Sequence, residues 1–69
     1  MSVNRAAIPT IVVCLRFRGH LGRAIAPAFE SVREARKWLA LQGFEPLEGM
    51  LYSKLDGDLQ VVVEIVDND

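Results

Sequence analysis

The sequence has very few of the residue types on which most active sites depend. Its 69 residues include a single cysteine, Cys14, and a single histidine, His20. One cysteine cannot form an intramolecular disulfide, and this pair cannot supply the four ligands of a structural zinc site. The sequence therefore predicts a domain with no metal and no cofactor.

A nucleophilic pair of Cys14 and His20 is the one catalytic arrangement to weigh. The expected strand and turn positions keep the two side chains apart, and no carboxylate is expected to orient the imidazole. The aspartates of Asp56-Gly57-Asp58 fit turn chemistry and lack the regular ligand spacing of a calcium loop. We therefore predict no catalytic residues and a protein that is not an enzyme.

Long apolar runs are missing as well. The run from Ile11 to Leu15 is far too short to span a bilayer, and the N-terminal residues lack the apolar core of a secretion signal. We therefore expect no membrane contact and a cytoplasmic, reducing location.

Charge is unevenly distributed along the chain. The net charge is −1, yet residues 1–42 carry seven basic and two acidic side chains (+5) and residues 43–69 carry one basic and seven acidic ones (−6). Such a division can create two surfaces of opposite charge, unless strand pairing interleaves the two parts and cancels much of the effect.

A helix is predicted over Ser31 to Gly43. Ser31 is a good N-cap, and Glu34 completes the spacing of a capping box. Gly43 suits the left-handed position just after a helix. One face of this helix carries a stripe of mainly apolar residues at helical spacing: Val32, Ala35, Trp38, Leu39 and Gln42.

Two strands are predicted before this helix. Thr10 to Arg18 alternates between apolar and mixed positions, with Ile11, Val13, Leu15 and Phe17 on the core face. Gly19 to Gly22 is predicted to be a turn. Arg23 to Phe29 is predicted to be an edge strand or an irregular extended segment, because Pro27 cannot donate a hydrogen bond within a sheet.

Two more strands are predicted after the helix. Leu47 to Lys54 forms the first, with an irregularity expected at Gly49. Asp56-Gly57 is a favoured hairpin turn, and Leu59 to Val66 forms the last strand, with alternating apolar residues.

These elements predict an α+β fold of the order ββαββ. We expect a four-stranded, mainly antiparallel sheet with the helix packed on one face. The 69 residues are too few for a second core, so 1–69 is predicted to be a single domain. Residues 1–9 are expected to form a ragged N-terminus, and residues 67–69 a solvated tail.

One helix can cover only one face of such a sheet. The other face is expected to be apolar enough to bind a protein partner or a second copy of the chain as a homodimer. Met50 and Tyr52 are the expected anchors, since such residues are enriched at interface cores. The predicted partner-binding residues are Met50, Tyr52, Val12, Val62, Glu48 and Glu64.

A basic surface is the alternative site, and it would serve a regulator that binds nucleic acid. The isoelectric point of about 5.7 and the 7% content of aromatic residues disfavour this alternative. Its residues are Arg16, Arg18, Arg33, Arg36 and Lys37.

The stretch from Glu30 to Val66 combines a capped helix, a Gly43-Phe44-Glu45 exit and an Asp56-Gly57 hairpin. In this architecture the chain resembles anti-CRISPR proteins, small accessory proteins of phages and other mobile elements. The resemblance implies a stoichiometric inhibitor that binds a CRISPR effector subunit and blocks target recognition or nuclease recruitment.

The chain is also similar to small toxin domains that have a Gly-Phe-Glu turn after a helix. Those domains depend on a histidine in the following strand, and Met50 to Lys54 contains none. This difference argues against a ribonuclease.

Overall fold

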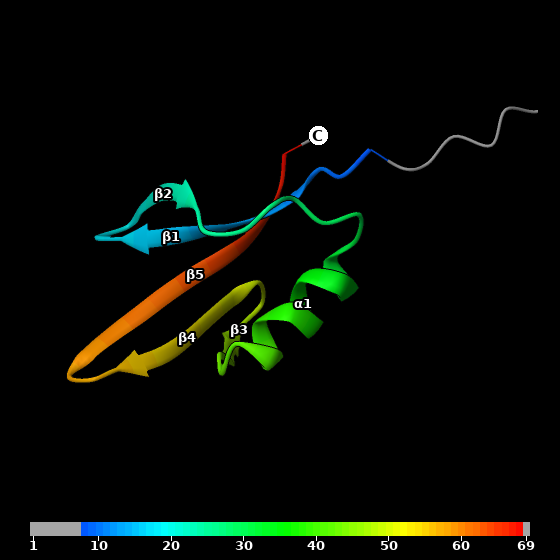
Figure 1. Cartoon of the computed structure of the whole chain (residues 1–69). Helices are drawn as coiled ribbons and strands as arrows, with labels where there is room; N and C mark the ends of the chain where they lie inside the picture. Colours follow the sequence, from blue (N-terminus) through cyan, green and yellow to red (C-terminus); the bar gives the residue numbers. More distant parts are fainter. Residues whose placement is uncertain (1–7, 69) are drawn as a thin grey trace, which may run out of the picture.

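The computed structural model describes residues 8–68, which form one helix against an antiparallel sheet of five strands (Figure 1). In chain order the elements are β1 (Ile11–Phe17), β2 (His20–Ala24), α1 (Val32–Leu41), β3 (Glu45–Glu48), β4 (Leu51–Asp56) and β5 (Leu59–Asp67). The strand order in the sheet is β2-β1-β5-β4-β3. The α+β class and the helix are confirmed, whereas the prediction of four strands is wrong by one.

The additional strand arises where one strand was predicted over Leu47 to Lys54. Gly49 has a φ of +53° and starts a turn that reverses the chain, so β3 and β4 form a hairpin. Glycine adopts this conformation without the steric cost that a Cβ atom brings. Pro46 lies in β3, which is an edge strand, where its missing N–H is tolerated.

The β1–β2 turn is formed by Arg18 and Gly19, and not by Gly19 to Gly22. Both residues have positive φ, +52° and +80°, and Phe17 pairs with His20 on either side of them. Two central residues of positive φ are typical of a type I′ turn, which suits the twist of paired strands. His20 therefore begins β2 and does not lie in a turn.

Of the two alternatives predicted for Arg23 to Phe29, an edge strand or an irregular extended segment, the residues after Ala24 form the second. β2 ends at Ala24, so Pro27 lies outside it. Phe29 then forms an isolated bridge with Ile11, in which each N–H donates to the other carbonyl at 3.0 and 2.7 Å. This extended segment carries the chain along β1 to the start of the helix.

The β4–β5 turn contains Gly57 and Asp58, because Asp56 pairs with Leu59. The prediction placed this turn one residue earlier. Gly57 has a φ of +65°, whereas the φ of Asp58 is not positive. Glycine at the first central position is the requirement of a type II′ turn.

Both ends of α1 have the caps that the sequence predicts. Ser31 Oγ accepts a hydrogen bond from the Glu34 N–H at 3.1 Å, and the Glu34 carboxylate accepts one from the Glu30 N–H. At the other end Gly43 has a φ of +90°, and the Phe44 N–H donates to the Leu39 carbonyl at 2.9 Å. This is a Schellman motif, which satisfies carbonyl groups left free at the helix end.

The core lies between α1 and the facing side of the sheet. Alternate residues of β1 and β5 point into it, and α1 supplies two fully buried side chains. The Phe29 and Trp38 rings, 5.8 Å apart, pack at its margin. The buried core residues are Ile11, Val13, Ala35, Leu39, Phe44, Tyr52, Val63 and Ile65.

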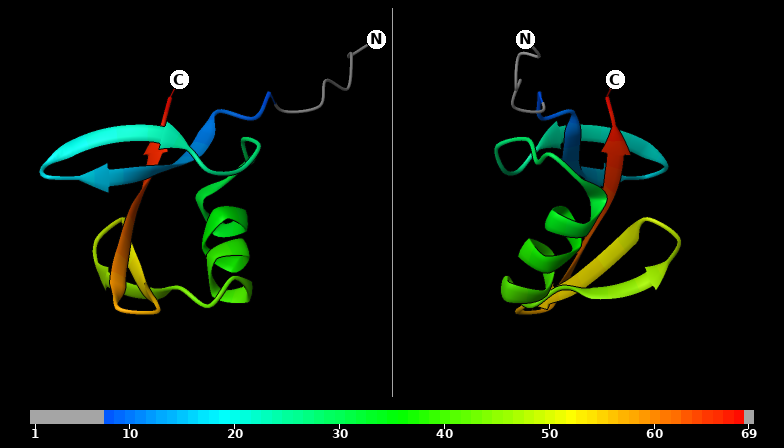
Figure 2. Two further views of the ribbon diagram at one scale, coloured as in Figure 1. Left: turned by 60° about the vertical axis from the view of Figure 1, so that its left-hand side comes forward. Right: turned by 90° about the vertical axis from the view of Figure 1, so that its right-hand side faces the viewer.

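The helix is much shorter than the sheet that it covers. Ten residues of helix span about 15 Å, whereas the nine residues of β5 span about 30 Å. Figure 2 shows α1 beside one part of the sheet while the β1–β2 hairpin extends past it. Phe17 and Leu59 are therefore 70% and 67% exposed, although their alternation is that of the core face.

The C-terminal residues that the structure describes are held by hydrogen bonds. Asp67 is the last residue of β5 and accepts a hydrogen bond from Thr10 Oγ1 at 3.1 Å, and the Asn68 N–H donates to the Thr10 carbonyl. Asp67 and Asn68 are exposed, as the predicted solvated tail requires, but Asp67 belongs to β5. Residues 1–7 of the predicted ragged N-terminus, and residue 69, lie outside the described residues. Within residues 8–68, no helix has the length and hydrophobicity needed to cross a membrane.

Candidate protein-binding surface

The face of the sheet opposite α1 is uncovered, and we call it the open face. Its residues alternate along each strand with the buried core residues, so their side chains point away from the helix. Strand pairing places Val12 beside Val66, and Val62 between Arg16 and Ser53. From the three central strands the open face comprises Val12, Cys14, Arg16, Leu51, Ser53, Val62, Glu64 and Val66, all of which are half-buried.

Four of the six predicted partner-binding residues lie on this face. Val12, Val62 and Glu64 come from β1 and β5, and Glu48 reaches the face from β3 by pairing with Leu51. Glu64 Oε1 forms an ion pair with Arg16 Nη1 at 3.0 Å, with about a third of each side chain exposed. Such an exposed pair contributes little to stability, but it partly neutralises two charges within an otherwise apolar area.

The prediction that Tyr52 lies on the uncovered face is wrong. Tyr52 pairs with Val63, so its side chain points toward α1 and is 5% exposed. Its hydroxyl accepts a hydrogen bond from Arg36 Nη1 at 2.7 Å, and the Arg36 guanidinium lies 5.7 Å from the ring centroid. Tyr52 is therefore a core residue that binds the sheet to the helix.

Met50 is also on the helix side. It lies in the β3–β4 turn, and its Sδ is 3.5 Å from Arg36 Nη2. The apolar position on the open face belongs to Leu51, which pairs with Glu64. Leu51 was not among the predicted residues, because a single strand over Leu47 to Lys54 lacks the turn that brings Leu51 opposite Glu48.

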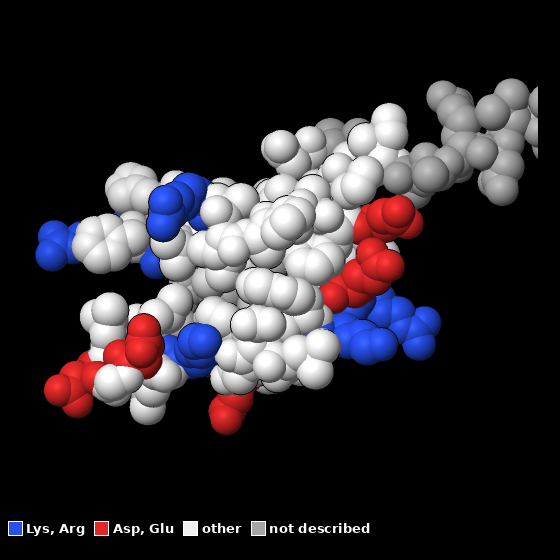
Figure 3. Space-filling model, viewed as in Figure 1, with Lys and Arg blue, Asp and Glu red and all other residues white. Residues whose placement is uncertain are grey.

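The five residues of the alternative basic surface do not form one surface. Arg16 is paired with Glu64, and Arg36 is bound to Tyr52. Arg18 lies at the tip of the β1–β2 hairpin, where its guanidinium is 5.4 Å from the Phe17 ring centroid. The other two, Arg33 and Lys37, are exposed on α1. Figure 3 accordingly shows separate blue areas, one group on the β1–β2 hairpin at the left and another beside the helix region at the right.

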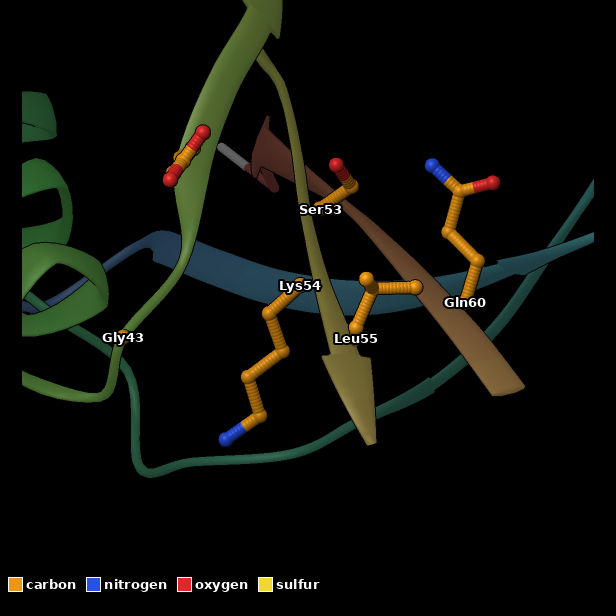
Figure 4. Close-up of a pocket in the computed structure, with 6 residues that line it drawn as sticks. Gly43, Ser53, Lys54, Leu55 and Gln60 are labelled. Carbon is orange, nitrogen blue, oxygen red and sulfur yellow. The ribbon is translucent and has the colours of Figure 1, made fainter. Parts of the chain in front are cut away.

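A polar hollow of about 240 Å³ lies between the end of α1 and strands β3, β4 and β5 (Figure 4). In Figure 4 the Lys54 side chain extends toward the side on which Gly43 lies, whereas the Ser53 and Gln60 side chains extend in other directions. Lys54 Nζ donates to the Gln42 carbonyl at 3.0 Å and lies 4.9 Å from the Phe44 ring centroid. The Lys54 amino group therefore caps the C-terminal end of α1, where a cation is favourable.

Cys14 and His20 are not brought together by the fold. Cys14 pairs with Ala24, whereas His20 pairs with Phe17. Three residues of strand separate the two positions, a distance of about 10 Å. Across residues 8–68, no cluster of three or more His, Cys, Asp or Glu side chains is arranged to hold a metal ion.

No protein-family model, curated protein or solved structure matches this chain.

Proposed function

We propose that the protein is a small, non-enzymatic binding module that masks the surface of a partner protein with its open face. The observation that carries this proposal is a group of five apolar side chains on the side of the three central strands that α1 leaves uncovered: Val12, Cys14, Leu51, Val62 and Val66. Apolar side chains gathered on an uncovered face favour an interaction site.

The charges around the open face indicate the chemistry of the partner. Glu48 and Glu45 lie on β3 at one edge of the sheet, and Glu45 pairs with Ser53 of the open face. A complementary partner would have an apolar centre with basic residues beside it. Basic surfaces are typical of proteins that bind nucleic acid, so the partner would be a nucleic-acid-processing protein such as a CRISPR effector subunit.

A pair of matched lysine substitutions tests this proposal. Val12→Lys places a charge on the open face, and Leu41→Lys places the same charge on α1, where Leu41 is 76% exposed. Proteins captured from host lysate by the wild-type chain are identified by mass spectrometry, and their affinities are then measured. We expect Val12→Lys to weaken binding at least tenfold, which is about 1.4 kcal/mol, and Leu41→Lys to bind as the wild type does.

Circular dichroism of both variants checks that the fold is retained. If a folded Val12→Lys variant binds the captured partner as tightly as Leu41→Lys does, the open face is not the binding surface.

Nucleic-acid binding remains the alternative function. Two of its five predicted basic residues are engaged within the fold, and the others lie in separate places. A gel-shift experiment at low salt tests it, because phosphate contacts are strongest there. Retardation that Arg33→Glu abolishes would favour this alternative over protein binding.

A further inference from the structure

The sheet divides into two separate hairpins at the end that α1 does not reach. Pairing between β1 and β5 ends at Arg16 and Val62, although β1 continues to Phe17 and β5 begins at Leu59. Figures 1 and 3 show the β1–β2 and β4–β5 hairpins diverging beyond this point. We call these two hairpin tips, residues 17–23 and 55–61, the splayed end.

The splayed end exposes several large apolar side chains. A hollow of about 300 Å³ lies between the hairpins, lined mainly by apolar side chains that include Leu15, Phe17, Leu59 and Val61. The tips also expose Leu21 (49%) and Leu55 (74%). Half of the eight exposed large hydrophobic residues described therefore lie at this one end, which is far from the scattered pattern of an ordinary surface.

The backbone at the splayed end also has an exposed edge. Residues 59–61 of β5 pair with β4, but the pairing of β5 with β1 begins only at Val62. An unpaired strand edge beside apolar side chains can bind another polypeptide segment, because the free backbone N–H and C=O groups of the edge can form hydrogen bonds with that segment.

The tips of the two hairpins carry opposite charges. Arg18 and Arg23 belong to the β1–β2 hairpin, and Asp56 and Asp58 belong to the β4–β5 hairpin. Figure 3 shows blue on the first and red at the tip of the second, with the gap between them. A surface with an apolar centre and opposite charges on its two sides is complementary to itself after a twofold rotation.

We propose that a second copy of the chain docks on the splayed end in a twofold symmetric dimer. The basic hairpin of each copy meets the acidic hairpin of the other, and the apolar hollows of both copies are covered together. The dimer contact lies at one end of the sheet and adjoins the open face at Arg16 and Val62, which also line the hollow. The inference is carried by the exposed apolar residues and the charges of the splayed end, so it does not rest on the proposed function.

Charge reversal tests this arrangement directly. Arg18→Asp with Arg23→Glu makes both hairpins acidic, and Asp56→Lys with Asp58→Lys makes both basic. Aspartate is chosen at position 18 because it tolerates positive φ better than most residues. We expect each double variant to dimerise at least tenfold more weakly than the wild type, and an equimolar mixture of the two to form a heterodimer, as measured by sedimentation velocity.

A matched control reverses two charges that lie elsewhere. Arg33→Glu with Lys37→Glu alters exposed cations of α1, and this variant should dimerise as the wild type does. A wild-type chain that stays monomeric at high micromolar concentration overturns the proposal. So does a mixture of the two folded reversal variants that stays monomeric. Loss of the dimer in Val12→Lys would place the contact on the open face instead.

Discussion

At the scale of single residues, Arg18 has a backbone conformation that a residue with a long side chain rarely adopts. Its φ of +52° is the one positive value at a non-glycine residue in the described chain. The left-handed region costs an ordinary L-residue roughly 1 kcal/mol. The type I′ turn requires this conformation, and it presents Arg18 beside the exposed ring of Phe17.

Replacing Arg18 with asparagine should therefore stabilise the fold. We expect Arg18→Asn to raise the free energy of unfolding by about 0.5 kcal/mol, because asparagine adopts positive φ more readily and the exposed cation–π contact that is lost is weak. Urea denaturation measures the change. Arg23→Asn, in strand β2, is the control: it removes the same charge from the same hairpin and should be neutral or slightly destabilising. A lower stability for Arg18→Asn than for this control contradicts the argument.

Tyr52 shows how residue pairing within a hairpin decides which face a side chain takes. A two-residue turn at 56–57 would pair Tyr52 with Val61, and the observed turn at 57–58 pairs it with Val63. Both partners are on the core face, since paired residues point to the same side of a sheet. The face of Tyr52 could therefore be derived from the sequence, but its hydrogen bond from Arg36 could not, because that bond depends on where the helix lies.

At the scale of elements, the ends of α1 are determined locally. Ser31, Glu34 and Gly43 act on backbone groups within a few residues of themselves, and all three have the roles that their spacing predicts. The strands were predicted less well. Their ends depend on which residues form the turns, and a shift of one residue in a turn changes every pairing beyond it.

The N-cap provides a test at this scale. Ser31→Ala removes the side-chain acceptor of the Glu34 N–H and should lower the free energy of unfolding by about 1 kcal/mol. Ser31→Asp keeps an acceptor at the same position and should retain most of the stability. Thermal and urea denaturation of the two variants make the comparison. Equal losses in both would show that the cap contributes no net stability here.

At the scale of the whole molecule, the mismatch in length between α1 and the sheet shapes both candidate surfaces. The helix covers the part of the sheet around Val13 and Val63, which are fully buried. Beyond its reach the hairpins separate and their apolar residues are exposed. A dimer through this end would bury them and would give the small domain support that its own core does not supply.

Dimerisation predicts that thermal stability depends on protein concentration. The midpoint of unfolding of the wild-type chain should rise with concentration, because mass action favours the associated folded state. The Asp56→Lys, Asp58→Lys variant should show a smaller dependence. Calorimetry over a hundredfold range of concentration measures both, and a concentration-independent midpoint for the wild type would contradict a dimer.

By itself, the sequence determined the local features of this protein: the helix with its two caps and the alternation of β1 and β5. These depend on neighbouring residues and on side-chain periods. The single cysteine also excluded an intramolecular disulfide. Only the tertiary structure decided which side chains are covered. Phe17 and Leu59 follow the core pattern yet are exposed, because burial also requires an opposing element that is long enough to reach them. The predicted basic residues are separated because they belong to β1, to the tip of its hairpin and to α1. The splayed end lies where the sheet extends past α1.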